Sequence, residues 1–376
     1  MGPTVALTYA RTVSDLRVLA RTLRGLEWIA GAEVQATLSQ PEIAYGHREL
    51  RFSVPDLSPQ LLALGTVDDV FLVAATAGGL GRARESLAKL AALAEVVDLD
   101  SYASMLGRSG SFDVVGSFVG KRNFSRFEIE DAFGAALAAA TGWTYESRSG
   151  GQPARGNLSL RVHLVDSEAT VAVRIAKVPL HRRVYRVASR PGSLHPPLAR
   201  ALALLAGLRP AATLVDPFCG TGTIAIEAKL ACPELQASAS DLDPEAVDAA
   251  RRNAAAAGIE LELAVRDAGE LPAADRVATN PPWEEAVATA GRVRLDPSSF
   301  ATRLQEVGRS VVLTPPETKL EGVVLENRVR VSGALAAILV LGDRPVDEGG
   351  LYGDELKRAL AVRDELSEAA SSPTSR

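Results

Sequence analysis

Along residues 188–345, segments with the hydrophobic pattern of a β-strand alternate regularly with segments that have the pattern of an α-helix. Short apolar runs of strand length are followed by Ala-rich amphipathic stretches of helix length. This alternation predicts an α/β domain with a mainly parallel sheet and helices on both faces. The predicted strands are residues 212–216, 236–241, 260–265, 276–279 and 310–313, and the runs 323–331 and 335–341 predict a closing antiparallel pair.

Turn and cap residues mark the helices of this zone. A Gly-rich turn precedes a predicted helix over 223–231. Asp243 and Pro244 suit an N-cap and a first helical position, and Gly258 suits a C-terminal cap, so we expect a helix over 244–257. Residues 346–376 lose the apolar pattern and predict a helix followed by a disordered tail.

The chain before residue 188 has an α+β pattern. Residues 1–75 predict strands at 5–10 and 48–54 and helices at 13–23 and 26–38. Residues 76–187 predict a strand at 112–118, a helix at 126–141, and a strand pair at 158–165 and 170–178. We therefore expect domains at 1–75, 76–187 and 188–345, with 346–376 as a C-terminal extension.

Composition excludes several classes of protein. A chain of 376 residues with 47% hydrophobic and 23% charged residues is typical of a globular protein with two or three domains. No run approaches the ~20 apolar residues that span a bilayer, and no secretory signal is expected. Two cysteines offer no disulfide framework, which suits the cytoplasm, and four histidines lack metal-ligand spacing. We expect no metal and favour a monomer.

The charge distribution changes this picture. The net charge is −5, yet residues 101–200 contain 14 Lys or Arg and 7 Asp or Glu, which gives +7 and leaves −12 for the rest. A basic middle segment in an acidic protein suggests a local anionic partner. The alternative is a general preference for arginine, because 35 of the 41 basic residues are Arg.

A candidate donor site follows the first strand of the α/β zone. The turn Asp216-Pro-Phe-Cys-Gly-Thr-Gly-Thr223 contains two glycines that let the backbone turn sharply and approach a ligand closely. Ligands of open α/β sheets bind beyond the carboxyl ends of the strands, where this turn lies. Asp241, at the end of the next strand, suits two ribose hydroxyls, and Asp267, after the third, would lie near an adenine amino group.

Two cofactors fit such a turn. The stretch Gly220-Thr-Gly-Thr-Ile-Ala225 matches the dinucleotide pattern G-x-G-x-x-A, although a lone match is weak. Asp216 would put a carboxylate near a pyrophosphate, whereas it suits the cationic amino acid end of S-adenosylmethionine. We therefore favour S-adenosylmethionine over a dinucleotide or a purely structural turn, and expect Cys219 to be packed rather than nucleophilic. The predicted cofactor contacts are Asp216, Phe218, Cys219, Gly220, Thr221, Gly222, Thr223, Asp241, Leu242, Asp267, Ala268, Asn280 and His195.

A candidate acceptor site, Asn280-Pro-Pro-Trp283, follows the fourth strand. An exocyclic amine is a poor nucleophile because its lone pair is delocalised into the ring. The Asn280 side-chain carbonyl and the Pro281 backbone carbonyl can accept its two N–H bonds and orient the lone pair. Pro281 and Pro282 stiffen the backbone, and Trp283 offers a face for stacking, worth ~1–3 kcal/mol. The pattern predicts methylation of a base amine; the alternative is a proline turn with a buried Trp.

Together these motifs resemble a known family. Residues 188–342 are similar to amino-methylating class I methyltransferases, and the middle segment resembles a THUMP RNA-binding domain. The similar stretches are Gly25-Leu-Glu-Trp28, Gly120-Lys-Arg-Asn-Phe-Ser-Arg126, Leu180-His-Arg-Arg-Val-Tyr-Arg186 and Gly192-Ser-Leu-His-Pro-Pro-Leu-Ala199. One departure is Glu284-Glu285, where the family has Gly; these carboxylates would repel phosphate unless they turn away or pair with Arg292 or Arg294.

The resemblance implies a Rossmann-like methyltransferase domain preceded by ferredoxin-like and THUMP regions. It implies transfer of a methyl group from S-adenosylmethionine to guanine N2 of tRNA, at guanosine 6 of the acceptor stem. The implied RNA contacts are Lys121, Arg122, Phe124, Arg126, Arg182, Arg183 and Arg186. Phe124 is equally suited to a core position. The alternatives are methylation of ribosomal RNA, DNA or protein glutamine, and a non-catalytic RNA-binding protein.

Overall fold

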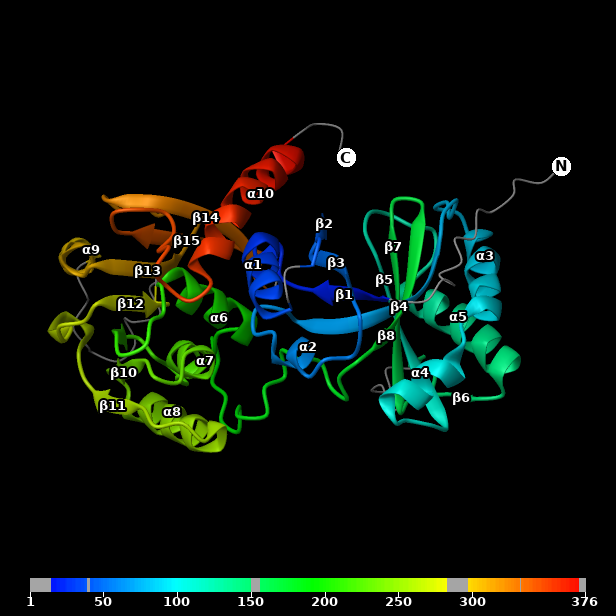
Figure 1. The fold of residues 1–376 in the computed structure, drawn as a ribbon, viewed down its shortest axis with the longest axis horizontal. Coiled ribbons are helices and arrows are strands. Elements are labelled where there is room, and N and C mark those ends of the chain that lie inside the picture. The colour runs from blue at the N-terminus through cyan, green and yellow to red at the C-terminus, as the bar shows by residue number, and fades with distance from the viewer. Residues whose placement is uncertain (1–14, 39–40, 150–155, 283–296, 332, 372–376) are drawn as a thin grey trace. The chain divides into compact units, whose positions relative to one another are not determined.

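The computed structural model describes residues 15–38, 41–149, 156–282, 297–331 and 333–371 (Figure 1). The chain forms two compact units. The first comprises Met1–Ala20, Arg51–Leu62 and Asp69–Pro179, and the second comprises Arg21–Leu50, Ala63–Asp68 and Leu180–Arg376. Among the described residues, no helix has the length and apolarity needed to cross a membrane.

An eight-stranded sheet organises the N-terminal part of the chain, in the order β2-β3-β1-β4-β8-β7-β5-β6. Its strands are β1 (Leu16–Arg21), β2 (Ala44–Gly46), β3 (Glu49–Val54), β4 (Asp69–Ala77), β5 (Ser111–Phe118), β6 (Thr144–Tyr145), β7 (Leu158–Val165) and β8 (Glu168–Arg174). The helices here are α2 (Gln60–Ala63), α3 (Ser86–Ala92), the 3-10 helix η1 (Leu93–Val96), α4 (Leu99–Leu106) and α5 (Arg126–Thr141).

Helix α5 covers one face of β5 and β7. Phe133 and Leu137 of α5 are buried with Phe112 of β5 and Leu160 of β7 in one core. The sequence predicts the bounds of this helix correctly. Its N-terminus has a capping box, in which the Ser125 side chain accepts from the Glu128 N–H and the Glu128 carboxylate accepts from the Ser125 N–H.

The predicted helix over 13–23 is wrong, because residues 16–21 form strand β1. This strand lies between β3 and β4 in the sheet. Val18, Leu19 and Ala20 are all buried, so the strand lacks the polar alternation that identifies a strand with one solvated face. The predicted strand over 5–10 lies outside the described residues.

The second unit has a seven-stranded sheet of order β11-β10-β9-β12-β13-β15-β14. Strands β9 to β13 pair in parallel, and β14 and β15 form an antiparallel pair, as the sequence predicts. The structure adds that β15 also pairs antiparallel with β13. These strands are β9 (Thr213–Asp216), β10 (Gln236–Asp241), β11 (Glu262–Val265), β12 (Arg276–Thr279), β13 (Arg309–Thr314), β14 (Val323–Val331) and β15 (Ala334–Leu341).

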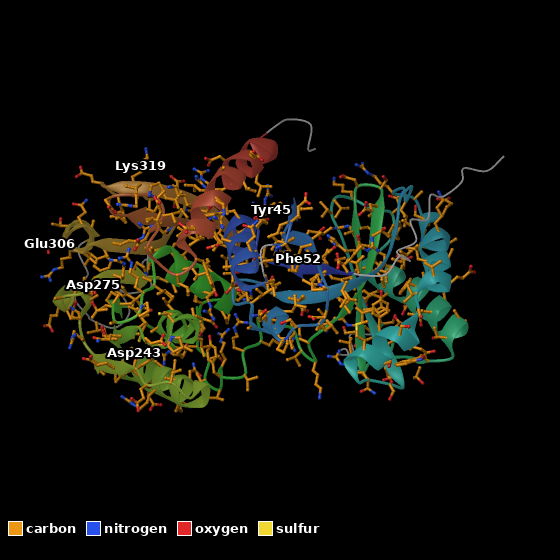
Figure 2. The ribbon with its side chains drawn as sticks, viewed as in Figure 1. Tyr45, Phe52, Asp243, Asp275, Glu306 and Lys319 are labelled. Atoms are coloured by element: carbon orange, nitrogen blue, oxygen red, sulfur yellow. The ribbon has the colours of Figure 1, made fainter. Side chains whose placement is uncertain are left out.

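Helices cover both faces of this sheet. Val311 and Val312 are neighbours on β13, yet Val311 packs with Leu202 of α6 (Pro196–Leu205) and Val312 packs with Phe300 of α9 (Pro297–Glu306). The other helices of the unit are α1 (Glu27–Thr37), α7 (Thr223–Ala231), α8 (Pro244–Ala257), the 3-10 helix η2 (Ala268–Glu270) and α10 (Gly353–Ser371). Asp243, labelled in Figure 2, caps α8 by accepting from the Glu245 N–H, and Gly258 ends the helix in the left-handed region, as predicted.

Helix α1 is part of the core of the second unit, although it lies early in the sequence. The Trp28 indole N–H donates to Asn327 Oδ1 of β14 at 3.0 Å, and the Asn327 amide donates to Gly25 O at 2.9 Å. A Cβ on Gly25 would lie 2.0 Å from Arg328 O, so this close approach of two backbones requires glycine. The stretch Gly25-Leu-Glu-Trp28 therefore anchors α1 to β14.

Candidate functional site

The donor turn begins with a buried carboxylate. Asp216, the last residue of β9, is only 1% exposed. Its Oδ1 accepts hydrogen bonds from the Thr279 hydroxyl at 2.7 Å and from the Phe218 N–H at 3.2 Å. Burial raises the pKa of Asp216 to about 7, because neither bond fully replaces the lost hydration. A cation bound beside this residue would favour its ionised form.

The two glycines of the turn have different roles. Gly220 has a φ of +52°, and no atom lies within 4 Å of where its Cβ would be, so the turn leaves open space on that side. Gly222, at the N-cap of α7, has a φ of +78°, and its Cβ would lie 3.0 Å from Ala250 Cβ of α8. A side chain at Gly222 would thus disturb the contact between α7 and α8.

Acidic residues follow the two neighbouring strands at the same sheet edge. Asp241, which ends β10, accepts from the Gly220 N–H at 2.9 Å through Oδ2 and from the Asp243 N–H at 3.0 Å through Oδ1. Asp267, after β11, accepts from the Gly269 N–H at 2.7 Å. Leu242 is 38% exposed next to Asp241. The parallel order β9, β10, β11 brings these residues to one edge, as the sequence predicts.

The remaining residues of the donor turn are packed. Cys219 is buried with Ala225, Ala239 and Ala250, and burial raises the pKa of its thiol, so a nucleophilic thiolate is disfavoured. Thr221 and Thr223 are buried with their hydroxyl oxygens 3.2 Å apart. Phe218 is partly buried and meets Phe300 edge-on at 5.3 Å. The expectation that Cys219 is a packed residue is confirmed.

The acceptor turn lies next to the donor turn. Strand β12 pairs in parallel with β9, with Val277 opposite Val215, so both strands end at the same edge. Asn280 is partly exposed, Pro281 is buried and Pro282 is exposed. Trp283 lies outside the described residues, as do Glu284, Glu285, Arg292 and Arg294. The predicted adjacency of the first and fourth strands is confirmed.

Asn253 of α8 is a residue that the sequence did not single out. It is fully buried, and its side chain donates to Thr221 O and Ala188 O at 3.0 Å and accepts from the Ala188 N–H at 2.8 Å. It therefore joins the donor turn to the segment before α6. The sequence feature that could have indicated this role is an Asn within an Ala-rich predicted helix.

The side chain of His195, a predicted cofactor contact, binds residues outside the donor turn. Its Nε2 lies 2.7 Å from Asp68 Oδ1, and its ring lies 5.3 Å from the ring of His181. Burial acts to raise the pKa of Asp68, but the hydrogen bond from His195 and nearby positive charges hold the pKa below its ordinary value. The imidazole of His195 is thus bound to Asp68, and its contact with a cofactor stays a prediction.

Arg183 does not fit the expected set of phosphate contacts, because its guanidinium group binds other residues of the protein. Its guanidinium is mostly buried and donates to Glu227 Oε1 at 2.8 Å, to Leu180 O at 2.6 Å and to Gly65 O at 2.6 Å. Glu227 of α7 is fully buried. These bonds engage the donors that a phosphate would need.

Glu227 also binds two further side chains. It accepts from the Tyr185 hydroxyl at 2.8 Å and from Arg200 Nε at 3.2 Å. The stretch Leu180-His-Arg-Arg-Val-Tyr-Arg186, which precedes the predicted α/β domain, is therefore anchored to α7. Arg182 is exposed and Arg186 is partly exposed, so both stay accessible.

The other basic stretch also divides into buried and accessible residues. Phe124 is 4% exposed and meets Phe118 edge-on at 6.4 Å within the first unit, so its expected stacking on a nucleotide is wrong. Arg122 donates to the carbonyl oxygens of Leu80, Gly81 and Asp166, so its guanidinium bridges two loops. Lys121 and Arg126 are exposed. A sequence pattern cannot separate these environments, because all four residues lie in one polar stretch that ends at the first residue of α5.

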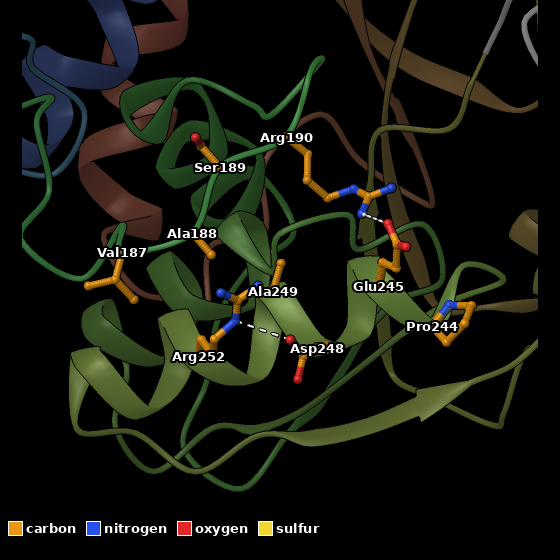
Figure 3. Close-up of a pocket in the computed structure, with 9 residues that line it drawn as sticks. All are labelled: Val187, Ala188, Ser189, Arg190, Pro244, Glu245, Asp248, Ala249 and Arg252. Atoms are coloured by element: carbon orange, nitrogen blue, oxygen red, sulfur yellow. Dashed lines mark hydrogen bonds and ion pairs between the residues drawn. The ribbon is translucent and has the colours of Figure 1, made fainter.

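A pocket of about 640 Å³ lies elsewhere in the second unit, between residues 187–190 and α8 (Figure 3). Arg190 donates to Asp243 and Glu245, and Arg252 pairs with Asp248 at 3.1 Å. The charges of this pocket therefore balance one another. None of the predicted donor or acceptor residues lines it, so we assign it no ligand. Within the described ranges, no group of His, Cys, Asp and Glu could hold a metal ion.

Comparison with known proteins identifies the family. Residues 183–336 match the family model described as RMKL-like, methyltransferase domain. Over 250 residues the chain is 38% identical to the tRNA (guanine(6)-N2)-methyltransferase of Thermus thermophilus, covering 65% of this chain and 71% of the relative. The chain belongs to the tRNA guanine-N2 methyltransferases.

Solved structures agree with this assignment. The methyltransferase superposes on the crystal structure of TrmN from Thermus thermophilus with a TM-score of 0.71 and 27% identity, covering 87% of this chain and 99% of the other. A putative methyltransferase crystallised with SAH, SMU.472, has the same fold, with a TM-score of 0.65 and 18% identity over 89% of this chain and 100% of the other.

Proposed function

We propose that this methyltransferase transfers a methyl group from S-adenosylmethionine to guanine N2 in tRNA, at guanosine 6. The observation that supports the proposal best is the adjacency of the two turns, because β9 and β12 pair and the Thr279 hydroxyl binds Asp216 across them. The relative named as a tRNA (guanine(6)-N2)-methyltransferase supports the choice of substrate.

The donor turn fits S-adenosylmethionine, which supplies an electrophilic methyl group. The open space beside Gly220 leaves room for a ligand against the backbone. The Asp216 carboxylate would face the ammonium group of the methionine moiety, and Asp241 the ribose hydroxyls. Asp267 would lie at the adenine, with Leu242 and Ala268 beside the ring. A dinucleotide is disfavoured, because the buried carboxylate of Asp216 would repel a pyrophosphate.

The acceptor turn orients the target amine. The Asn280 amide oxygen and the Pro281 carbonyl oxygen would accept the two N–H bonds of guanine N2, which directs its lone pair at the methyl group. Catalysis then consists mainly of positioning. The proton leaves to water after transfer. Because the target lies in a helical stem, the guanine must be flipped out, at a cost of a few kcal/mol.

The accessible basic residues are the proposed RNA contacts. Residues 76–187 form the proposed THUMP domain. Lys121 and Arg126 are exposed in its part within the first unit, and Arg182 and Arg186 are accessible in its last residues, which belong to the second unit. Such residues neutralise phosphates and position the RNA without reading its sequence. We further propose that the protein acts as a monomer in the cytoplasm.

Charge reversal tests the proposed phosphate contact of Arg182. Arg182→Glu is expected to weaken tRNA binding by about tenfold and to reduce the slope of log K against log salt by about one, because one phosphate contact is lost. The matched control is Arg251→Glu, which reverses the charge of an exposed arginine that lies on α8 and is not a proposed RNA contact. Titrations of tRNA binding at several salt concentrations measure both quantities. An unchanged slope for Arg182→Glu contradicts its phosphate contact.

Asp216→Asn should stabilise the free protein while weakening donor binding. The folded-state pKa lies above the unfolded value of 3.8, so the native state binds the extra proton between the two values, and stability falls as pH rises from about 4 to about 7. At about pH 8 we expect the amide to raise the free energy of unfolding by at least about 1 kcal/mol, since one pKa unit is about 1.4 kcal/mol. Calorimetric unfolding and titration with S-adenosylmethionine measure the two effects. A destabilised variant would contradict the buried-charge assignment.

Nucleoside analysis tests the function directly. Unmodified tRNA is incubated with the protein and labelled S-adenosylmethionine, digested, and analysed by mass spectrometry. We expect N2-methylguanosine, and a G6→A transcript that accepts no label. Label at another guanosine overturns the assignment of the position. A protein that binds S-adenosylmethionine but labels no RNA overturns the choice of substrate.

A further inference from the structure

We propose that Thr279 is a positioning residue, which holds one oxygen of Asp216 and thereby presents the other oxygen to the donor while fixing the backbone that bears Asn280. This inference rests on the proposed function, because it assigns Asp216 to the donor and Asn280 to the acceptor. It adds a residue to the site that neither turn motif contains.

Side-chain hydrogen bonds tie β9 and β12 at both ends. At their starts, Asp275 Oδ2 accepts from the Thr213 N–H and hydroxyl, and the Thr213 Oγ1 accepts from the Asp275 N–H, each at 2.9 Å. At their carboxyl ends, the Thr279 hydroxyl donates to Asp216 Oδ1 at 2.7 Å. The second bond is buried, since Thr279 is 0% and Asp216 1% exposed. The spacing of the two turns is thus set by a bond that water does not reach.

The bond also selects which oxygen of Asp216 is available. Oδ1 accepts from both Thr279 and the Phe218 N–H, whereas Oδ2 accepts no hydrogen bond from any residue within the described ranges. Asp216 is almost fully buried, so an oxygen of its carboxylate that receives no hydrogen bond is costly unless a ligand supplies a donor. The ammonium group of S-adenosylmethionine is such a ligand.

Thr279 acts on Asn280 through the backbone. The two residues are adjacent, and a β-branched side chain has few rotamers, so fixing the Thr279 hydroxyl fixes the direction in which the chain leaves β12. Burial and the charge of Asp241 raise the pKa of Asp216. The hydrogen bond from Thr279 acts in the opposite direction and favours the ionised form. The Cys219 thiol is a further titratable group near Asp216, and it stays neutral because burial raises its pKa.

The experiment compares Thr279→Val, which keeps the shape but removes the donor, with Thr279→Ser, which keeps the hydroxyl. The Kd for S-adenosylmethionine is measured by calorimetry between about pH 6 and pH 9, and the single-turnover rate of tRNA methylation is measured at saturating donor. Thermal unfolding checks that both variants fold.

We expect Thr279→Val to raise the Kd by about tenfold near pH 7, with a smaller effect at about pH 9, where Asp216 ionises again. The single-turnover rate at saturating donor should fall by about tenfold, because Asn280 is less well aligned. Thr279→Ser should restore both quantities to within about threefold of the wild type.

Three results would overturn the inference: a valine variant equal to the wild type, a serine variant as impaired as valine, or a Kd ratio that is the same at every pH. If the valine variant does not fold, the serine variant still tests the role of the hydroxyl. Wild-type protein in the same assay separates this inference from the proposed function. A wild type that binds no S-adenosylmethionine overturns both, whereas a wild type that binds and methylates leaves the function standing whatever Thr279 does.

Discussion

Asn280→Ala is expected to lower the single-turnover rate of tRNA methylation by about 10²–10³-fold, while the Kd for S-adenosylmethionine changes by less than about twofold. The amide oxygen of Asn280 acts on the amine that attacks, and the described hydrogen bonds of the donor turn do not involve this side chain. Losing it therefore removes alignment in the transition state and leaves the donor site intact.

The loss is large because a guanine amine is weakly nucleophilic. Without Asn280 the nitrogen keeps one carbonyl acceptor, that of Pro281, and its lone pair is free to turn away from the methyl group. Remote binding of tRNA through basic residues would be unaffected, so the KM for tRNA should change little.

Asn157→Ala is the matched control, because Asn157 is an exposed asparagine of the first unit. It should methylate tRNA at the wild-type rate. An Asn280→Ala variant with wild-type activity would remove the proposed role of Asn280. Equal loss of donor binding and of rate would instead place Asn280 in the donor site.

Glu227→Ala is expected to lower the free energy of unfolding of the second unit by about 3–5 kcal/mol, the range found when one partner of a buried ion pair is removed. Glu227 is fully buried and accepts from Arg183, Arg200 and Tyr185. Its loss would leave two guanidinium groups without their carboxylate. Burial acts to lower the pKa of Arg183, but the adjacent charge of Glu227 raises it above its ordinary value, so this arginine stays charged.

Glu234→Ala tests whether the effect depends on burial. Glu234 is an exposed glutamate just after α7, and its replacement should change stability by less than about 0.5 kcal/mol. Urea unfolding followed by circular dichroism measures both variants. A Glu227→Ala protein as stable as Glu234→Ala would show that the arginines find other partners.

Local patterns predicted the catalytic part of the fold well. The bounds of α7, β10, α8 and β12 agree with the pattern, because Gly-rich turns, an Asp-Pro start and a Gly end interrupt the apolar runs. A short parallel strand followed by an amphipathic helix has a strong local signal.

The failures have a common physical cause. β1 reads as a helix because its apolar residues are consecutive, which only its central place in the sheet explains. Phe124 and Arg183 lie in polar stretches and face the interior. In both cases the neighbours that bury the residue are distant in sequence, so no local pattern contains the information.

The sequence by itself determined the class of fold, the donor and acceptor motifs and the family resemblance, because glycines, prolines and acidic residues at strand ends have local meaning. Only the tertiary structure decided which arginines are accessible, what His195 contacts and how Thr279 joins the two turns. These properties depend on side chains that meet across strands, such as Asp216 and Thr279, which are 63 residues apart in the chain.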